Sequence, residues 1–549
     1  MALFVTGMTT EALENTGEVD AVSHTTSYMP IDTQPPISRL PSETLTEIFA
    51  YLPLSIHELK EYRQAGTFPR WLAVTHVSQH WRRDAYACRD LWAYIPLESV
   101  EWTRVALQHS NPIPIIIDVD TLDVARDYIQ PDAVLLAFDS LARASEVNLT
   151  EERGLPTVQL IKHLTNSRLP FLKSLKTFVT PISERIPVPA IFFHAQYLPS
   201  LRHLDIVGAT NFLTMSSFSP PSSLTSLSLM DFACLWATTA EMVETLRLLP
   251  NLQELSIQDC LPDIDSLDVT PVEFACLTHL SLGGGVLSLS WATRLIYAPA
   301  CLILELEPVL DYEEHTVPEL VGLVQAMLYP HVKTAVDAGV SYHTLTLLHM
   351  DEDGETHVHL TVDPSSQRSG GTGSVHLSLH HMNWGANEER AAEEAGVIAR
   401  AVLSCLPLSG VRVLNIGTAI IKASTWTSIL PQVLEVSAKG AAACDLLKLL
   451  YDVHSRAHAD IPPPLPSLEL LVIFEVDFED IADGFSPFEA SLSVLAARWE
   501  GPYPACHLAL HGCKVTPDDV DALTDIIGDD LLWCRAPQQS VSSPLEDAE

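Results

Sequence analysis

The chain has 549 residues, more than one hydrophobic core usually supports, so a small module beside a larger domain or repeat array is expected. Hydrophobic residues make up 47%, which indicates a packed chain rather than a disordered one. With 70 acidic and 31 basic residues the formal net charge is −39, which argues against partners such as nucleic acid or an anionic membrane surface and leaves room for basic ones.

The two ends and the cysteines indicate the compartment. Residues 1–36 are polar, rich in threonine and without period, and residues 536–549 are similar, so both are predicted to be disordered tails. The first residues lack the basic region of a signal peptide, and no apolar run approaches the roughly 20 residues of a membrane helix. Ten cysteines without a CxxC pattern indicate reduced thiols. A cytoplasmic or nuclear protein is expected.

A short helical module is predicted over residues 37–98. Its first helix shows one apolar stripe at positions i, i+3, i+4 and i+7, made by Leu45, Ile48, Phe49 and Leu52. Pro41 suits the first turn of this helix, where its missing N–H is not needed. A second helical face and a third short unit follow, with Trp71, Val74, Val77, Ser78 and Trp81 in the second and Leu91 and Trp92 in the third. The plain interpretation is a three-helix bundle packed on the rest of the chain.

These same residues resemble a known family. The runs LPSETLTEIFAYLP and WLAVTHVSQHWRRDAYACRDLWAYIPL are similar to an F-box of the kind abundant in mushroom-forming fungi. Four elements agree in order, namely Leu40-Pro41, Ile48-Phe49, Val77 through Trp81-Arg82, and Leu91-Trp92. Residues 54–70 are longer than the linker of a minimal F-box.

The resemblance implies an adaptor that binds the Skp-type subunit of a cullin–RING ubiquitin ligase, and through it the cullin. The residues that it implies for adaptor binding, some facing inward and some facing the adaptor, are Leu40, Pro41, Leu45, Ile48, Phe49, Val77, Trp81, Leu91 and Trp92. Ubiquitin transfer would belong to other subunits, so no catalytic residue is expected in this chain. The alternative is an interaction scaffold that acts without ubiquitination.

From residue 99 to 535 helix-like and strand-like segments alternate. Four segments share the frame LxxLxL, and their first leucines are Leu201, Leu224, Leu252 and Leu277. The spacings of 23 to 28 residues fall in the range of leucine-rich repeats, although no asparagine ladder follows the strands. The predicted fold class is therefore α/β: a small all-α three-helix F-box followed by an irregular, degenerate leucine-rich-repeat-like solenoid with a parallel sheet on its concave side.

Other strands and helices of this region are predicted from composition and capping. Strands are expected at 115–119, 146–149, 175–178, 302–306, 345–349, 375–380, 411–416, 468–474 and 507–510. Helices are expected at 242–249 and 320–328. A further helix at 518–527 has strong capping signals, with Thr516 as its N-cap, Pro517 at its first position and Gly528 at its end.

Signatures of catalysis and of metal binding are weak. The sequence lacks GxSxG, GxxxxGK[ST] and HExxH, so neither an enzyme nor a cofactor is expected. Gly283-Gly284-Gly285 is interpreted as a turn between repeats rather than an oxyanion loop. Two groups contain residue types that bind zinc, but both are interpreted as strand positions. The first comprises His357, His359, His376, His380 and His381, and the second comprises Cys506, His507, His511 and Cys513.

A candidate substrate surface follows from the LxxLxL frame. The leucines belong to the core, and the residues between them point outward on the concave face. The predicted row of short polar side chains comprises Asp205, Ser228, Ser256 and Ser281. Such a row suits a protein or peptide substrate of unknown identity; the alternative is a face that is merely solvated.

Overall fold

A computed structural model provides the coordinates. It describes residues 40–52, 70–120, 129–151, 168–179, 196–208, 220–231, 236–263, 269–299, 301, 303–310, 315–337, 342–352, 355–364, 374–381, 388–417, 422–455, 464–479, 485–500, 504–528 and 531–534. The two predicted tails, 1–36 and 536–549, and nearly all of the long linker, 54–70, lie outside these ranges.

The described chain is an α/β structure. Its helices are α1 (Ser42–Ala50), α3 (Val74–Val77), α4 (Gln79–Ala87), α5 (Val100–His109), α7 (Pro131–Phe138), α9 (Thr239–Arg247), α10 (Val286–Leu295), α11 (Val317–Asp337), α12 (Glu388–Cys405), α13 (Ala423–Ile429), α14 (Gly440–Ser455), α15 (Pro487–Glu500) and α16 (Pro517–Ile527). Short 3-10 turns lie at Arg70–Ala73 and Arg89–Trp92. The α/β class predicted from the sequence is confirmed.

Within the described residues, the strands form one long sheet of 16 strands and a separate pair, β7 (Val272–Glu273) with β9 (Ile296–Tyr297). In spatial order the long sheet contains β1 (Ile115–Asp120), β2 (Ala144–Glu151), β3 (Ser174–Val179), β4 (His203–Val207), β5 (Ser226–Met230), β6 (Glu254–Gln258), β8 (His279–Gly285), β10 (Ile303–Leu310), β13 (Ser374–His381), β12 (Glu355–Pro364), β11 (Tyr342–Glu352), β14 (Val413–Ile416), β15 (Glu435–Lys439), β16 (Leu470–Phe474), β17 (His507–His511) and β18 (Leu531–Cys534). The prediction that the strands beginning at Leu201 and Leu252 share one sheet is confirmed.

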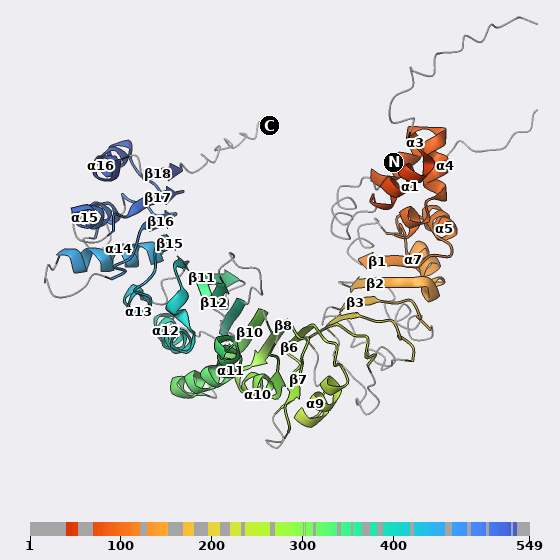
Figure 1. Ribbon diagram of the computed structural model, residues 1–549, viewed down its shortest axis with the longest axis horizontal. Coiled ribbons are helices and arrows are strands. Elements are labelled where there is room, and N and C mark those ends of the chain that lie inside the picture. The colour runs from red at the N-terminus through yellow and green to blue at the C-terminus, as the bar shows by residue number, and fades with distance from the viewer. Residues whose placement is uncertain are drawn as a thin grey trace, which may run out of the picture.

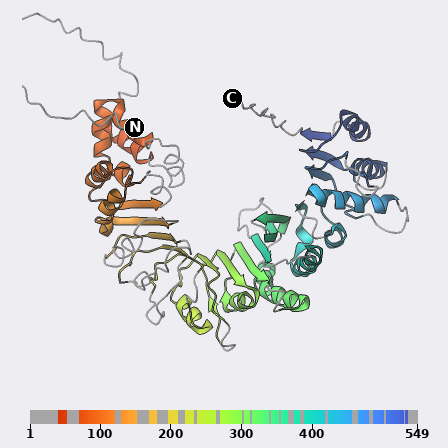
Figure 2. The ribbon, with the colours of Figure 1, turned by 180° about the vertical axis from the view of Figure 1, so that it is seen from behind.

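The elements follow an open arc, with the sheet on its inner side and the helices on its outer side (Figure 1). The view from behind shows the same arrangement, with the N-terminal helices at one end of the arc and α15 and α16 at the other (Figure 2). The described part of the long sheet is thus open, and its two end strands, β1 and β18, are not neighbours.

The leucines of the LxxLxL frame hold each repeat strand against the core. The first leucine, for example Leu201 or Leu252, is fully buried and lies just before the strand, while the next leucine, Leu204 or Leu255, is the first inward residue of the strand. Along β4 and β5 buried and partly exposed residues then alternate, as a strand with one buried face requires. The predicted strands therefore began two residues too early, because the first leucine packs in the core without joining the hydrogen-bond ladder.

The residues that follow the strands form two aligned rows with positive φ. One row continues β4, β5, β6 and the end of β8, and the other follows β15, β16 and β17. The first row contains Gly208, Asp231, Asp259 and Gly284, and the second contains Gly440, Glu475 and Gly512. Glycine adopts this left-handed region without strain and aspartate tolerates it, whereas glutamate does so only at a cost. A change of backbone direction is thus repeated at one edge of the sheet.

The prediction of a wholly parallel sheet is wrong in the middle of the chain. β12 pairs antiparallel with both β11 and β13, whereas β10 and β13 pair in parallel, as do β11 and β14. The three strands stand in reverse spatial order, so that β10 is followed in space by β13. Helices α11 and α12, which enter and leave this insertion, contact each other. The short β11–β12 connection accounts for the antiparallel pairing of these two strands, because only antiparallel neighbours can be joined so closely.

Two arginines fix loops through hydrogen bonds to backbone carbonyls. Arg498 of α15 is fully buried, and its guanidinium donates to the carbonyls of Pro464, Leu465 and Leu468 just before β16. Arg143 does the same for the loop before β1, where it donates to the carbonyls of Leu107 and Ile113. Each arginine satisfies carbonyls that would otherwise lack donors inside the protein.

The N-terminal helices share one continuous hydrophobic core with the sheet. The Trp92 ring stacks on Trp102 of α5 with ring centroids 6.4 Å apart, and its Nε1 donates to the carbonyl of Ala85 at 2.8 Å. Tyr94 then forms a parallel bridge to Ile116 of β1. The helical module and the first strand therefore pack as one body in the structure.

Candidate functional site

The residues predicted for adaptor binding divide into three groups by exposure. Leu45, Phe49, Leu91 and Trp92 are fully buried and hold the helices together. Leu40 and Trp81 are partly buried against the same core. Pro41, Ile48 and Val77 are exposed, Ile48 by 43% and Val77 by 58%. The structure thus leaves three of the nine predicted side chains free to meet a partner.

One exposed apolar residue of this module was not predicted. Tyr51, the C-cap residue of α1, is 82% exposed and follows Ile48 by three positions, so both lie on the same side of the last turn. Beneath them Phe49 packs edge-to-face on Trp81, with ring centroids 5.4 Å apart. We call Pro41, Ile48, Tyr51 and Val77 the N-terminal apolar surface. Its polar neighbour Ser78 caps α4 by accepting from the Trp81 amide.

The predicted polar row lies on neighbouring strands. Asp205, Ser228, Ser256 and Ser281 are aligned in register across β4, β5, β6 and β8. The first three line a cavity of about 310 Å³, which we call the N-terminal groove. Its other lining residues are Ser174, Lys176, His203, Leu204, Ser226, Leu227, Glu254, Leu255 and His279.

The prediction that Ser281 points outward with the other residues of the polar row is wrong. Its side chain is buried, with 6% exposure, and its Oγ lies 3.1 Å from Nε2 of Gln258, which is itself buried. The Gln258 side chain also lies over Gly283, where a Cβ atom would fall 1.5 Å from Oε1 of Gln258. The glycine run predicted as a turn is therefore the end of β8, which leads directly into α10.

Two cationic or titratable side chains of the N-terminal groove, Lys176 and His279, contact carboxylates. Lys176 Nζ lies 3.8 Å from a carboxylate oxygen of Asp205. His279 Nε2 lies 3.1 Å from a carboxylate oxygen of Glu305 on β10. The hydrogen bond to Glu305 raises the pKa of His279 above its ordinary value, although partial burial acts in the opposite direction. This groove presents mainly serine hydroxyls beside two internal ion pairs.

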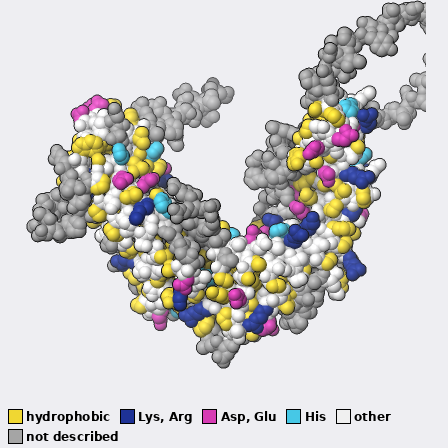
Figure 3. Space-filling model, viewed as in Figure 1, with side chains coloured by type: hydrophobic (Ala, Val, Ile, Leu, Met, Phe, Trp, Pro, Cys, Tyr) yellow, Lys and Arg dark blue, Asp and Glu magenta, His cyan; other side chains and the backbone are white. Residues whose placement is uncertain are grey.

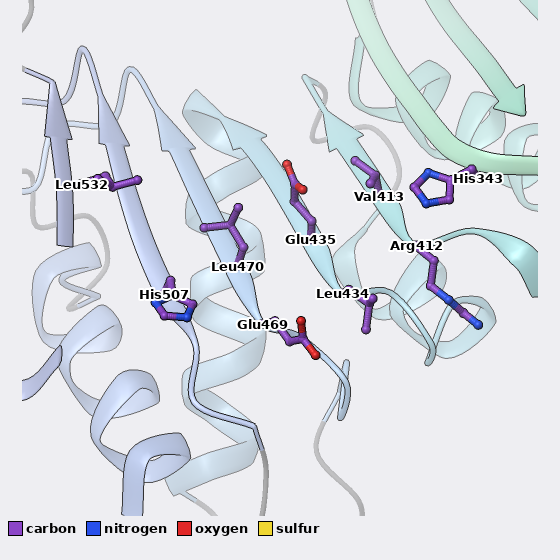
Figure 4. Close-up of a pocket in the computed structure, with 9 residues that line it drawn as sticks. All are labelled: His343, Arg412, Val413, Leu434, Glu435, Glu469, Leu470, His507 and Leu532. Carbon is purple, nitrogen blue, oxygen red and sulfur yellow. The ribbon is translucent and has the colours of Figure 1, made fainter. Parts of the chain in front are cut away.

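A larger groove, which the sequence did not predict, crosses the C-terminal strands. Its volume is about 560 Å³, and we call it the C-terminal groove (Figure 4). Its lining residues are His343, Arg412, Val413, Leu434, Glu435, Glu469, Leu470, His507 and Leu532. Val413, Glu435, Leu470 and His507 are directly aligned across β14, β15, β16 and β17. Acidic and histidine side chains gather on the inner side of this arm (Figure 3).

The two groups weighed as zinc sites give no metal cluster in the described part of the chain. The register aligns His357 with His380 and Thr361 with His376, but the side chains of this histidine group lie outside the described residues. In the second group Cys506 and Cys513 are buried while His507 is exposed. Burial raises the pKa of the Cys506 thiol to about 11, so this thiol stays protonated.

Comparisons with known proteins add no assignment: no protein-family model matches the chain, and no curated protein matches it. Within the described ranges, every helix is too short or too polar to cross a membrane. The surfaces that stand out are therefore the N-terminal apolar surface and the two grooves on the inner face of the sheet.

Proposed function

We propose that the chain is an F-box adaptor that binds the Skp-type subunit of a cullin–RING ubiquitin ligase and holds a protein substrate on its repeat domain. In this proposal the helices before residue 98 are the F-box and the arc behind them is a degenerate leucine-rich-repeat solenoid. The chain supplies recognition, and ubiquitin transfer belongs to other subunits.

The observation that carries the proposal is the N-terminal apolar surface. Ile48, Tyr51 and Val77 are exposed on helices whose opposite faces are buried. They occur within the sequence pattern that resembles the F-box. Burial of each such side chain at an interface would stabilise a complex by roughly 1.5–3 kcal/mol. The position of this surface at one end of the arc leaves the inner face of the sheet open to a second partner (Figure 1).

The test replaces two exposed side chains and leaves the core intact. We expect Ile48→Asp combined with Val77→Asp to abolish co-purification of a Skp-type adaptor, because charged groups would be buried without partners. The matched control is Leu248→Asp at the C-cap of α9, which is also about half exposed and lies outside the module. It should bind the adaptor as the wild type does.

Two results separate the alternatives. Full adaptor binding by the double variant, with unchanged circular dichroism, would overturn the F-box proposal. Binding of the adaptor without co-purification of the cullin would favour the scaffold that acts without ubiquitination. For that alternative, the same grooves would serve a partner that is held rather than degraded.

A further inference from the structure

We propose that the C-terminal groove is the docking site for a protein segment that carries a lysine or arginine side chain next to apolar side chains. This inference rests on the proposed function, because the segment would belong to the protein substrate that the adaptor holds. It places recognition in the second half of the chain, away from the row at Asp205, Ser228 and Ser256.

The first step is the state of the carboxylates in the groove. Glu435 is half-buried and Glu469 is exposed, and neither forms an ion pair with any residue that the structure describes. The lysines of these strands are engaged at the other end of the sheet, where Lys439 pairs with Glu475 at 3.0 Å and Lys514 with Asp477 at 2.6 Å. The groove thus holds two carboxylates that an incoming cation could neutralise.

The single arginine of the groove does not supply that cation. Arg412 Nη1 donates to the carbonyl of Gln432 at 3.2 Å, which directs the guanidinium toward the loop before β15. In Figure 4 the Arg412 side chain points away from both Glu435 and Glu469. In the N-terminal groove, by contrast, Lys176 and His279 already contact carboxylates.

The second step is the apolar part of the lining. Leu532 of β18 is 62% exposed, which is unusual for a leucine in a strand. Val413, Leu434 and Leu470 are each partly exposed beside the carboxylates. Removal of such surface from water would contribute free energy to binding, while the charges would select the partner.

The third step is the order of these groups across the sheet. Arg412 lies just before β14, Glu435 is the first residue of β15, Glu469 lies just before β16, and Leu532 belongs to β18. Neighbouring strands lie about 4.8 Å apart. An extended segment that runs across the strands therefore needs one to two residues to pass from one strand to the next. The complementary segment has its cation opposite Glu435 and Glu469 and an apolar side chain several residues farther along.

A phosphorylated segment fits this groove poorly. A phosphate group near Arg412 would bring its double negative charge close to Glu435 and Glu469, and like charges repel. The overall charge of −39 adds to this preference for a cationic partner.

The experiment selects a random library of dodecapeptides on the full-length wild-type chain and on the variant Glu435→Lys/Glu469→Lys. We expect the wild type to enrich peptides that contain lysine or arginine close to leucine, isoleucine or phenylalanine. The variant should bind those peptides roughly tenfold more weakly, which corresponds to about 1.4 kcal/mol. The matched control Glu254→Lys changes an exposed strand glutamate of the N-terminal groove and should retain wild-type binding.

Three outcomes would overturn the inference: no enriched peptide, enriched peptides without a basic residue, or equal binding by the double variant when its circular dichroism is unchanged. A Leu532→Asp variant gives an independent check, since it should weaken the same peptides without touching the carboxylates. Adaptor co-purification, measured on each groove variant, should be unchanged. Peptide binding therefore tests the groove proposal, and adaptor co-purification separately tests the F-box proposal.

Discussion

His279 is the residue of the inner face whose protonation is linked most clearly to a neighbour. The imidazole lies 3.1 Å from Glu305, and that contact raises its pKa above the ordinary value of 6.5. A raised pKa in the folded state means that the contact stabilises the protein fully below the unfolded pKa, and that this stabilisation is lost as the pH rises through the folded pKa.

The prediction is that Glu305→Gln lowers the free energy of unfolding more at pH 5.5 than at pH 8.5. The glutamine removes the charge that holds the proton on His279, so the destabilisation appears only where His279 is protonated. Denaturant titration at both pH values measures it. Glu273→Gln, on an exposed strand position in the small β7–β9 sheet, serves as the control and should show no such difference. An equal loss at both pH values would contradict the linkage.

At this scale the sequence predicted burial only in part. Leu45 and Phe49 of the predicted apolar stripe are buried, whereas Ile48 of the same stripe is 43% exposed. The burial of Ser281 could not be foreseen, because it depends on the side chain of Gln258 from the adjacent strand. Nor could the role of Arg498 be foreseen, since its three carbonyl partners lie about 30 residues earlier in the chain.

Among the elements, the two rows of residues with positive φ show that different residue types adopt the same left-handed backbone conformation. Glu475 has φ of 53° and its neighbour Gly440 has φ of 54°. A residue with a Cβ atom in the left-handed region costs roughly 1–2 kcal/mol, and the exposed Lys439–Glu475 pair offsets only part of that.

We therefore predict opposite signs for two substitutions at equivalent positions. Glu475→Gly should stabilise the protein by about 0.5–1 kcal/mol, and Gly440→Ala should destabilise it by about 1–2 kcal/mol. Glu469→Gly is the control, because that glutamate lacks a positive φ and glycine there should destabilise by about 0.5–1 kcal/mol. Urea unfolding followed by tryptophan fluorescence measures all three. Destabilisation by Glu475→Gly equal to that by Glu469→Gly would show that no strain is relieved.

Element prediction succeeded where hydrophobic spacing was regular. The LxxLxL segments all entered neighbouring strands, and the capping signals placed α16 correctly, with Thr516 and Asp519 forming a capping box. Strands β15 and β18 were missed, because Glu435–Lys439 and Leu531–Cys534 are short and lack the frame. The position of β12 between β11 and β13 was missed because pairing order depends on contacts remote in sequence. The C-terminal groove depends on two of these missed strands.

For the whole molecule, the dominant electrostatic quantity is the net charge of −39. Charge of one sign destabilises a compact chain through self-repulsion. The ion pairs among the residues that the structure describes are mostly exposed, and such pairs contribute little.

We predict that the midpoint of thermal unfolding rises when NaCl is increased from 10 to 150 mM. Screening shortens the Debye length from about 30 Å to about 8 Å, which weakens repulsion between distant carboxylates. Differential scanning calorimetry measures the shift, and sodium sulfate at matched ionic strength tests for ion-specific effects. A lower midpoint in both salts would mean that attractive ion pairs outweigh the repulsion.

The reversed order of β11, β12 and β13 has a consequence for synthesis on the ribosome. When β10 emerges, its free edge cannot be covered by the next strand made, because its partner β13 lies about sixty residues farther along the chain. At translation rates of roughly 5–20 residues per second, that edge stays unpaired for about 3–12 s. The N-terminal half of the arc thus passes through a vulnerable interval, during which a chaperone or a neighbouring nascent chain has access to the edge of β10.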